Sequence, residues 1–167
     1  MIRSLCHCDT SHLISSGAVI LGYRRSILQH PIDNAGYNTT HAVCLFGLGR
    51  TSADPLIRKA CMQYGLTILP EPEDQNLFSR SDNYPLVQRG VPAPCYSLGM
   101  TAWDKEILDH YHRPSDEVGN MDLDYIVRFI RAYILSAQYI ANEPLQPKWV
   151  AGDPYEKDWQ TLYRKTQ

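Results

Sequence analysis

The sequence predicts an α/β protein, because short apolar runs of strand length alternate with patterns of helical period. Strands are expected at residues 41–46, 66–69 and 91–98. A helical pattern follows the first of these strands, and a longer one begins at residue 123. The chain has 167 residues, of which 44% are hydrophobic. This suffices for one domain with a proper core and is too little for two ordinary domains.

The first strand and the helix after it are expected from local signals. The apolar run at 41–46 ends at two glycines. Ser52 is then expected to be the N-cap of a helix, with Asp54 and Pro55 in the first turn, where both residue types are favoured. Gly65 would end this helix. Its apolar face at helical spacing consists of Leu56, Ile57, Ala60, Cys61 and Tyr64.

The middle of the chain is expected to contain short elements separated by loops. The acidic, proline-containing residues 70–74 favour an exposed extended loop over an acidic cation site. Ser81 or Asp82 would cap a short helix that stops at Gly90. The next predicted strand contains prolines at positions 92 and 94. It is therefore expected either to lie at a sheet edge or to have these prolines among its first residues. Residues 99–109 are interpreted as a loop.

A long helix is expected after Asp122, which would be its N-cap. Its broad apolar stripe should pack on the sheet, so its aromatic residues are interpreted as core. The stripe consists of Leu123, Ile126, Phe129, Ile130, Tyr133, Ile134, Ala137 and Ile140.

These elements divide the chain into three parts. Residues 1–40 are irregular, with a short strand expected at 18–21 and a loop at 24–38. Residues 41–142 contain the regular elements. Residues 143–167 are polar and rich in proline, and they are interpreted as a tail wrapped over the domain.

Charge and hydropathy exclude several classes of partner. A net charge of −2 gives no general attraction to nucleic acid or to anionic lipid. No apolar run has the length needed to cross a bilayer, and the N-terminal residues lack the continuous apolar stretch of a signal peptide. We therefore expect neither a nucleic-acid nor a membrane partner, and the compartment stays open.

The five cysteines do not form a recognisable framework. The Cys-His-Cys-Asp sequence at 6–9 resembles a metal motif but lacks a second pair to complete a tetrahedral site. Cys44, Cys61 and Cys95 lie in apolar runs and are expected to be small buried hydrophobes.

The sequence Tyr-His-Arg-Pro-Ser-Asp-Glu at 111–117 carries the most specific chemical signal. A histidine followed by a rigid proline and two acids can hold its imidazole in one direction, as a metal ligand requires. A histidine in a polar loop is also often a solvated surface residue, and both interpretations stay open on the local pattern. The motif follows a predicted strand, and open α/β sheets bind ligands beyond their strands.

Three ordered motifs resemble the C-terminal part of the two-zinc aminopeptidase family. They are Arg-Ser-Asp-Asn-Tyr-Pro at 80–85, Gly-Val-Pro-Ala at 90–93 and the motif at 111–117. The family includes bacterial leucyl aminopeptidases and glutamate carboxypeptidase, and the resemblance covers roughly residues 41–155. It implies a mixed sheet between helix layers, two zinc ions, a peptide substrate and hydrolysis by a metal-activated water. Its members are often secreted or periplasmic.

The resemblance also implies roles for particular residues. His112 matches the last zinc ligand of the family, and Tyr111 matches the tyrosine that stabilises the oxyanion of the tetrahedral intermediate. Asp116 and Asp82 would be supporting residues. Two further metal ligands are suggested by weaker likenesses. His7 lies in a sequence like the family's His-x-Asp motif, and Asp33 lies in one like the segment around the bridging aspartate.

The departures from the family pattern predict an incomplete site. The chain contains no Glu-Glu pair, which supplies the base and one ligand in the family, and Asn83 stands where the family usually has histidine. We therefore expect a domain without much of its N-terminal half, inactive alone and able to oligomerise through an exposed sheet edge. The alternatives are a metal-free binding module and a fragment with no independent role.

Overall fold

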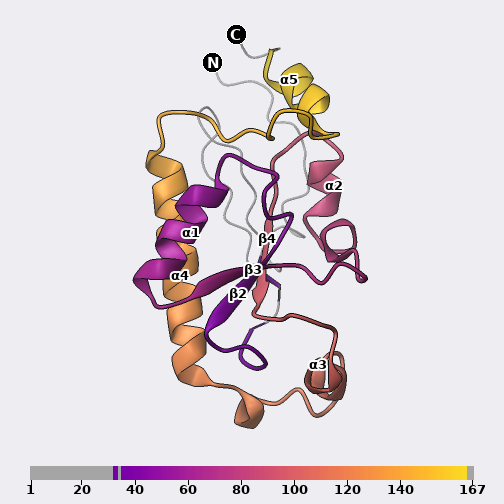
Figure 1. Ribbon diagram of the computed structural model, residues 1–167, viewed down its shortest axis with the longest axis vertical. Helices are drawn as coiled ribbons and strands as arrows, with labels where there is room; N and C mark the ends of the chain where they lie inside the picture. Colours follow the sequence, from indigo (N-terminus) through magenta and orange to yellow (C-terminus); the bar gives the residue numbers. More distant parts are fainter. Residues whose placement is uncertain (1–31, 34, 165–167) are drawn as a thin grey trace, which may run out of the picture.

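A four-stranded mixed sheet lies between two layers of helices in the computed structural model, which describes residues 32–33 and 35–164 (Figure 1). The strands are β1 (Ile32–Asp33), β2 (Ala42–Phe46), β3 (Thr67–Pro70) and β4 (Cys95–Leu98), in the order β1-β4-β2-β3. β2 is parallel to β3 and antiparallel to β4, and β1 is parallel to β4. The predicted α/β class with a mixed sheet is confirmed.

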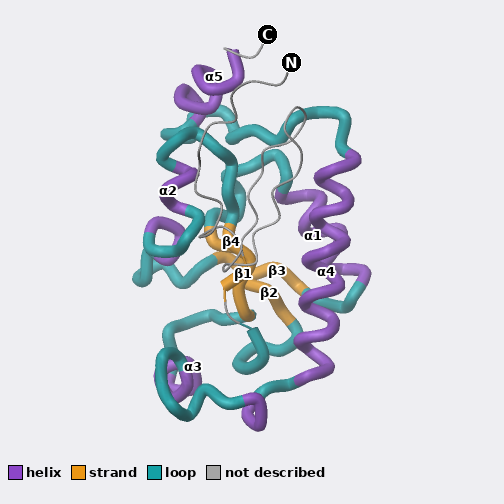
Figure 2. The backbone as a smooth tube through the Cα atoms, turned by 180° about the vertical axis from the view of Figure 1, so that it is seen from behind, coloured by secondary structure: helices purple, strands orange, loops and turns teal. Residues whose placement is uncertain are grey.

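The helices are divided between the two faces of the sheet (Figures 1 and 2). α1 (Asp54–Gln63) and α4 (Leu123–Asn142) pack against each other on one side. α2 (Tyr84–Val87) and α3 (Lys105–His110) lie on the other side, and α5 (Glu156–Arg164) follows near the C-terminus. In the described part of the chain, no helix is long and apolar enough to cross a membrane.

β2 connects the two halves of the core. All five of its residues are buried. Because side chains alternate along a strand, Val43 and Leu45 enter the core beneath α1 and α4, whereas Cys44 and Phe46 enter the core beneath α2 and α3. Burial on both faces explains why the strand reads as a continuous apolar run rather than an alternating one.

The predicted helix after the first strand is present, but its cap is not Ser52. Ala53 occupies the N-cap position without a side-chain hydrogen bond. The Ser52 hydroxyl instead accepts a hydrogen bond of 3.0 Å from the Lys148 backbone N–H. The expected N-cap was wrong because a distant segment, which local sequence rules do not include, occupies the hydroxyl. The apolar face was predicted correctly, with Ile57 and Cys61 fully buried.

Three other local predictions need correction. The stretch expected to be a loop at 99–109 contains most of α3, and the loop expected at 24–38 contains β1. Asn83, rather than Ser81 or Asp82, is at the N-cap position of α2. β4 lies in the interior of the sheet and begins after both prolines. It is therefore neither an edge strand nor a strand with prolines among its first residues, and both predicted alternatives were wrong. The strand expected at 18–21 lies outside the described residues.

α4 begins as predicted, but only part of its apolar stripe packs on the sheet. The Asp122 carboxylate accepts a hydrogen bond of 2.9 Å from the Tyr125 backbone N–H. Tyr125 and Phe129 are fully buried. The expectation that the whole stripe is core was wrong, because Leu123, Ile130 and Ile134 are exposed.

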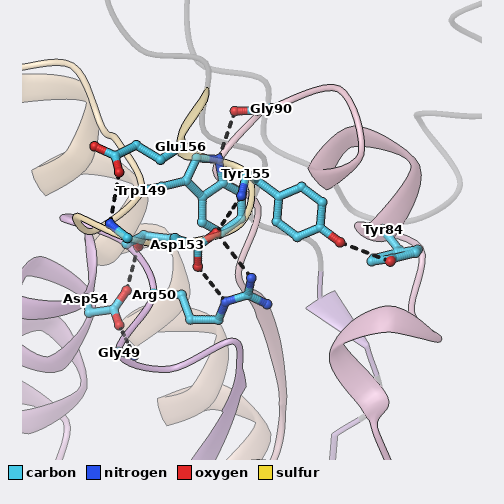
Figure 3. Close-up of polar contacts among 11 residues, drawn as sticks. Gly49, Arg50, Asp54, Tyr84, Gly90, Trp149, Asp153, Tyr155 and Glu156 are labelled. Carbon is cyan, nitrogen blue, oxygen red and sulfur yellow. Dashed lines mark hydrogen bonds and ion pairs between the residues drawn. The ribbon is translucent and has the colours of Figure 1, made fainter. Parts of the chain in front are cut away.

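Polar contacts of Trp149 and Asp153 hold the segment after α4 against the domain (Figure 3). The Trp149 indole is buried and donates a hydrogen bond of 2.9 Å to the Gly90 carbonyl oxygen. Arg50 forms an ion pair with Asp153 at 2.8 Å. These contacts join the end of the chain to the loop after β2 and to the segment before β4.

Candidate functional site

A cavity lies between the sheet and the helix layer of α2 and α3. Its volume is about 80 Å³. Seven of the ten lining residues are apolar or aromatic, but polar atoms supply more than half of the exposed surface, with one arginine and two serines on the polar side. The lining residues are Phe46, Leu77, Arg80, Ser81, Ser97, Leu98, Met100, Trp103, Ile107 and Tyr111. Such a hollow, with apolar side chains and a few polar groups, is typical of a small-ligand site.

α3 positions one wall of this cavity. Asp104 caps the helix by accepting a hydrogen bond of 3.1 Å from the Ile107 backbone N–H. The Asn38 amide donates to both oxygens of the same carboxylate at 3.0 Å, and the Asn38 backbone N–H donates to Glu106. The cap therefore ties α3 to the turn between β1 and β2. Sequence analysis missed Asp104, although an aspartate three residues before a buried isoleucine is a recognisable cap signal.

The motif at 111–117 leaves α3 beside the cavity. The Tyr111 ring is half-buried and lies 5.1 Å from the Trp103 ring and 4.1 Å from the His112 ring, between centroids. His112 is exposed and adopts a φ of 59°, in the left-handed region that few side chains favour. The chain therefore turns sharply between the residue that lines the cavity and the histidine after it.

Three side chains hold the turn that follows. The His110 Nδ1 atom lies 2.9 Å from the Ser115 carbonyl oxygen, and the Asn120 amide donates to the same oxygen at 2.8 Å. The Ser115 hydroxyl donates to the Asp109 carbonyl oxygen. The residues around His112 are thus fixed by backbone carbonyls rather than by an acidic partner. The sequence carried no signal for these contacts, because they depend on how the turn closes.

The other predicted site residues are only partly brought together. β1 pairs with β4 so that the backbone of Asp33 lies beside Ser97, which lines the cavity. Asp82 and Asp116 are exposed. His7 lies outside the described residues. The motifs at 80–85 and 111–117 therefore meet at one cavity, with the strand that contains Asp33 next to it.

Comparison with protein families shows to which family the chain belongs. The model described as Peptidase family M28 matches residues 31–137, more than half of the 167-residue chain. The chain belongs to peptidase family M28. It is therefore a protein of a zinc-dependent peptidase family. The match contains every residue that lines the cavity. Comparisons with curated proteins and with solved structures gave no match.

The described part of this peptidase-family chain does not by itself form a zinc site. A zinc ion needs three or four nitrogen, sulfur or carboxylate ligands in fixed geometry. Within residues 35–164, no three His, Cys, Asp or Glu side chains are grouped so that they could hold a metal. His112 is the donor nearest to the cavity-lining Tyr111 in sequence. We therefore derive no catalytic step through a metal at this site.

The buried cysteines are not alternative ligands. Cys44 and Cys61 are free and fully buried. Burial raises the pKa of the Cys44 thiol to about 12 and also raises the pKa of Cys61. Both side chains lie in apolar core clusters, and among the described residues no further donors are grouped with either of them as a metal site requires. The prediction that these residues and Cys95 are small buried hydrophobes is confirmed.

Asn83 connects two of the family motifs in the core. Its side chain is fully buried, and its amide donates a hydrogen bond of 2.7 Å to the Ala93 carbonyl oxygen. This contact joins the motif at 80–85 to the Gly-Val-Pro-Ala motif at 90–93. In this chain the residue in place of the usual histidine therefore has a packing role.

Removal of the α3 cap should loosen the wall of the cavity. Asp104→Ala is expected to lower the free energy of unfolding by about 1 kcal/mol, because the first turn loses its side-chain acceptor. Urea denaturation would measure this loss, and amide hydrogen exchange would show whether α3 opens first. Asp109→Ala on the same helix is the control, since its pair with Lys105 is exposed and should contribute little. Equal effects of the two substitutions would contradict the assignment.

Proposed function

We propose that this chain forms the substrate-binding part of an aminopeptidase site. The carrying observation is that the cavity shares Tyr111 with the motif at 111–117, so a side chain bound in the cavity would lie next to the predicted reacting groups. The seven apolar or aromatic residues of the lining would contact an aliphatic or aromatic side chain. In this proposal, the cavity receives the side chain of the N-terminal residue of a peptide.

The roles proposed for the surrounding residues follow the family resemblance. The Tyr111 hydroxyl would donate a hydrogen bond to the oxyanion formed at the scissile carbonyl. His112 would be a metal ligand, and Asp33 could be another. Zinc in this family supplies an activated water and polarises the carbonyl. Since these donors are fewer than a catalytic zinc needs, we propose that the chain binds peptides without hydrolysing them when it is alone.

Ligand binding tests the proposed role of the cavity. Leucinamide offers a free amine and an aliphatic side chain, and calorimetric titration would measure its dissociation constant. Ser81→Leu should weaken binding by about tenfold or more, because a branched side chain then enters a cavity of small volume. Ser79→Leu is a matched control, since each serine hydroxyl donates to a nearby backbone carbonyl and only Ser81 lines the cavity. Binding that is insensitive to Ser81→Leu would contradict the proposal.

The direction of binding can be tested with the same variants. Arg80 lines the cavity and is cationic, so a peptide C-terminal carboxylate is the competing ligand. N-acetyl-leucine carries that carboxylate and no free amine. If it binds more tightly than leucinamide and Arg80→Gln abolishes the difference, the site has carboxypeptidase rather than aminopeptidase polarity.

Zinc content and turnover separate an enzyme from a binding module. The absence of a complete donor set among the described side chains favours the binding module as the second candidate. We expect less than stoichiometric zinc and no hydrolysis of leucine nitroanilide by the chain alone. Stoichiometric zinc that is lost in His112→Ala, together with turnover, would overturn this expectation and show a complete metal site.

A further inference from the structure

α4 carries an apolar stripe that the described part of the domain covers only in part. Its members are Leu123, Val127, Ile130 and Ile134, which are 58%, 45%, 43% and 51% exposed. They are separated by four, three and four residues, so they lie on one side of the helix. Four large aliphatic side chains aligned over three turns form a patch of the kind that marks an interaction surface.

The stripe lies on the flank of α4 that faces away from α1. Tyr139 faces α1, since its hydroxyl accepts a hydrogen bond of 2.7 Å from the Gln63 amide. Ile130 precedes Tyr139 by nine residues, which at about 100° per residue places the two on opposite sides of the helix. Figures 1 and 2 show α4 at the outside of the helix layer. A second helix could therefore approach the stripe without displacing α1.

The spacing of the stripe is symmetric when it is read in either direction. In an antiparallel copy of α4, Leu123 would lie opposite Ile134 of the partner copy, and Val127 opposite Ile130 of the partner copy. Every exposed apolar residue then meets another, and a two-fold axis passes between the two central residues. A contact of this kind uses the same patch on both partners, as two-fold symmetric dimers do.

The charges beside the stripe match the same arrangement. Asp124 and Arg131 are both exposed on one border of the stripe, seven residues apart. In the antiparallel pair, Asp124 lies near Arg131 of the partner copy, and symmetry repeats this contact. In a parallel two-fold pair the equivalent borders would lie on opposite sides of the contact, so Asp124 and Arg131 would not meet across it. We propose that two copies of this chain associate through antiparallel contact of their α4 helices.

The proposed contact is small. Eleven residues between the ends of the stripe correspond to about 17 Å of helix. One pair of helices in contact over this length buries less surface than a typical specific interface. We therefore expect a reversible dimer with a dissociation constant of tens of micromolar or weaker. The inference concerns assembly and does not depend on the proposed peptide-binding function.

Sedimentation equilibrium of the full chain from about 5 to 500 micromolar tests the proposal across the expected range. Ile130→Lys should raise the dissociation constant by at least about tenfold, because it places a charge at the centre of the contact. Met62→Lys is the matched control, since Met62 is 69% exposed on α1 and lies outside the stripe. It should leave the dissociation constant unchanged.

Charge reversal tests the antiparallel register. Asp124→Arg and Arg131→Asp should each weaken the dimer about threefold to tenfold, because each places like charges together at both symmetric positions. The double variant should restore the original dissociation constant. A purely non-specific apolar association would not show this restoration.

Three results would overturn the proposal. The chain could stay monomeric throughout the range, or Ile130→Lys could leave a dimer intact. Alternatively, Ile130→Lys could lower the melting temperature of a monomer, which would mean that another segment of the same chain covers the stripe.

Discussion

Gly99→Ala is expected to lower the free energy of unfolding by about 3 kcal/mol or more, because a new methyl group would overlap backbone atoms that cannot move aside. A Cβ atom at this position would lie 2.3 Å from the Thr39 carbonyl oxygen and 2.7 Å from the Ala42 carbonyl oxygen. Thr39 lies in the turn that leads into β2, and Ala42 is the first residue of that strand. Equilibrium urea denaturation would measure the loss.

Gly99 is also part of a hydrogen-bonded junction between the sheet and α4. Its backbone N–H donates to the Tyr125 hydroxyl at 3.1 Å, and that hydroxyl donates to the Ala42 carbonyl oxygen at 2.7 Å. Tyr125→Phe removes the bridge without a steric clash and should cost about 1–3 kcal/mol. This variant keeps the test informative if Gly99→Ala does not fold.

Gly119→Ala is the control for these substitutions. No atom lies within 4 Å of a Cβ at Gly119, so little change in stability is expected. If Gly99→Ala were as stable as Gly119→Ala, this result would contradict the close approach of Gly99 to the Thr39 carbonyl oxygen.

Arg50→Ala is expected to lower the free energy of unfolding by about 2–4 kcal/mol, because it leaves the Asp153 carboxylate buried without its cation. The Asp153 side chain is only 3% exposed, and the Arg50 Nε atom lies 2.8 Å from its Oδ2. The guanidinium carbon also lies 4.3 Å from the centre of the Phe78 ring and 5.4 Å from that of Trp149. Denaturation and limited proteolysis after residue 143 would measure the effect.

The conservative variant separates charge from geometry. Arg50→Lys keeps the positive charge but loses the planar group that pairs with Asp153 and stacks on the rings, so it should recover only part of the stability. Arg58→Ala, at an exposed position on α1, should have little effect. If Arg50→Lys recovered the full free energy of unfolding, the positive charge alone would be enough to hold the segment that contains Asp153.

The candidate site was predictable to the extent that its residues are adjacent in sequence. Tyr111 and His112 lie in one motif, and the structure places Tyr111 at the cavity as a motif of this kind suggests. Asp104 had a local cap signal that was overlooked, but its contact with Asn38 and that of His110 with a carbonyl oxygen across a turn had none. Such contacts form between segments that no local pattern relates.

Hydrophobic period and residue order alone determined the α/β class, the approximate positions of β2, β3 and β4, the start of α4 at Asp122 and the family motifs. These features depend on neighbours within a few residues, where propensity and side-chain spacing act directly. Only the tertiary structure decided that Ser52 binds the C-terminal segment, that Asn83 packs in the core, and that three of the eight residues in the predicted α4 stripe stay exposed. Each of these outcomes depends on which distant segment covers a side chain. A sequence pattern predicts the face of the helix or strand on which a side chain lies, but it does not predict which segment packs against that face.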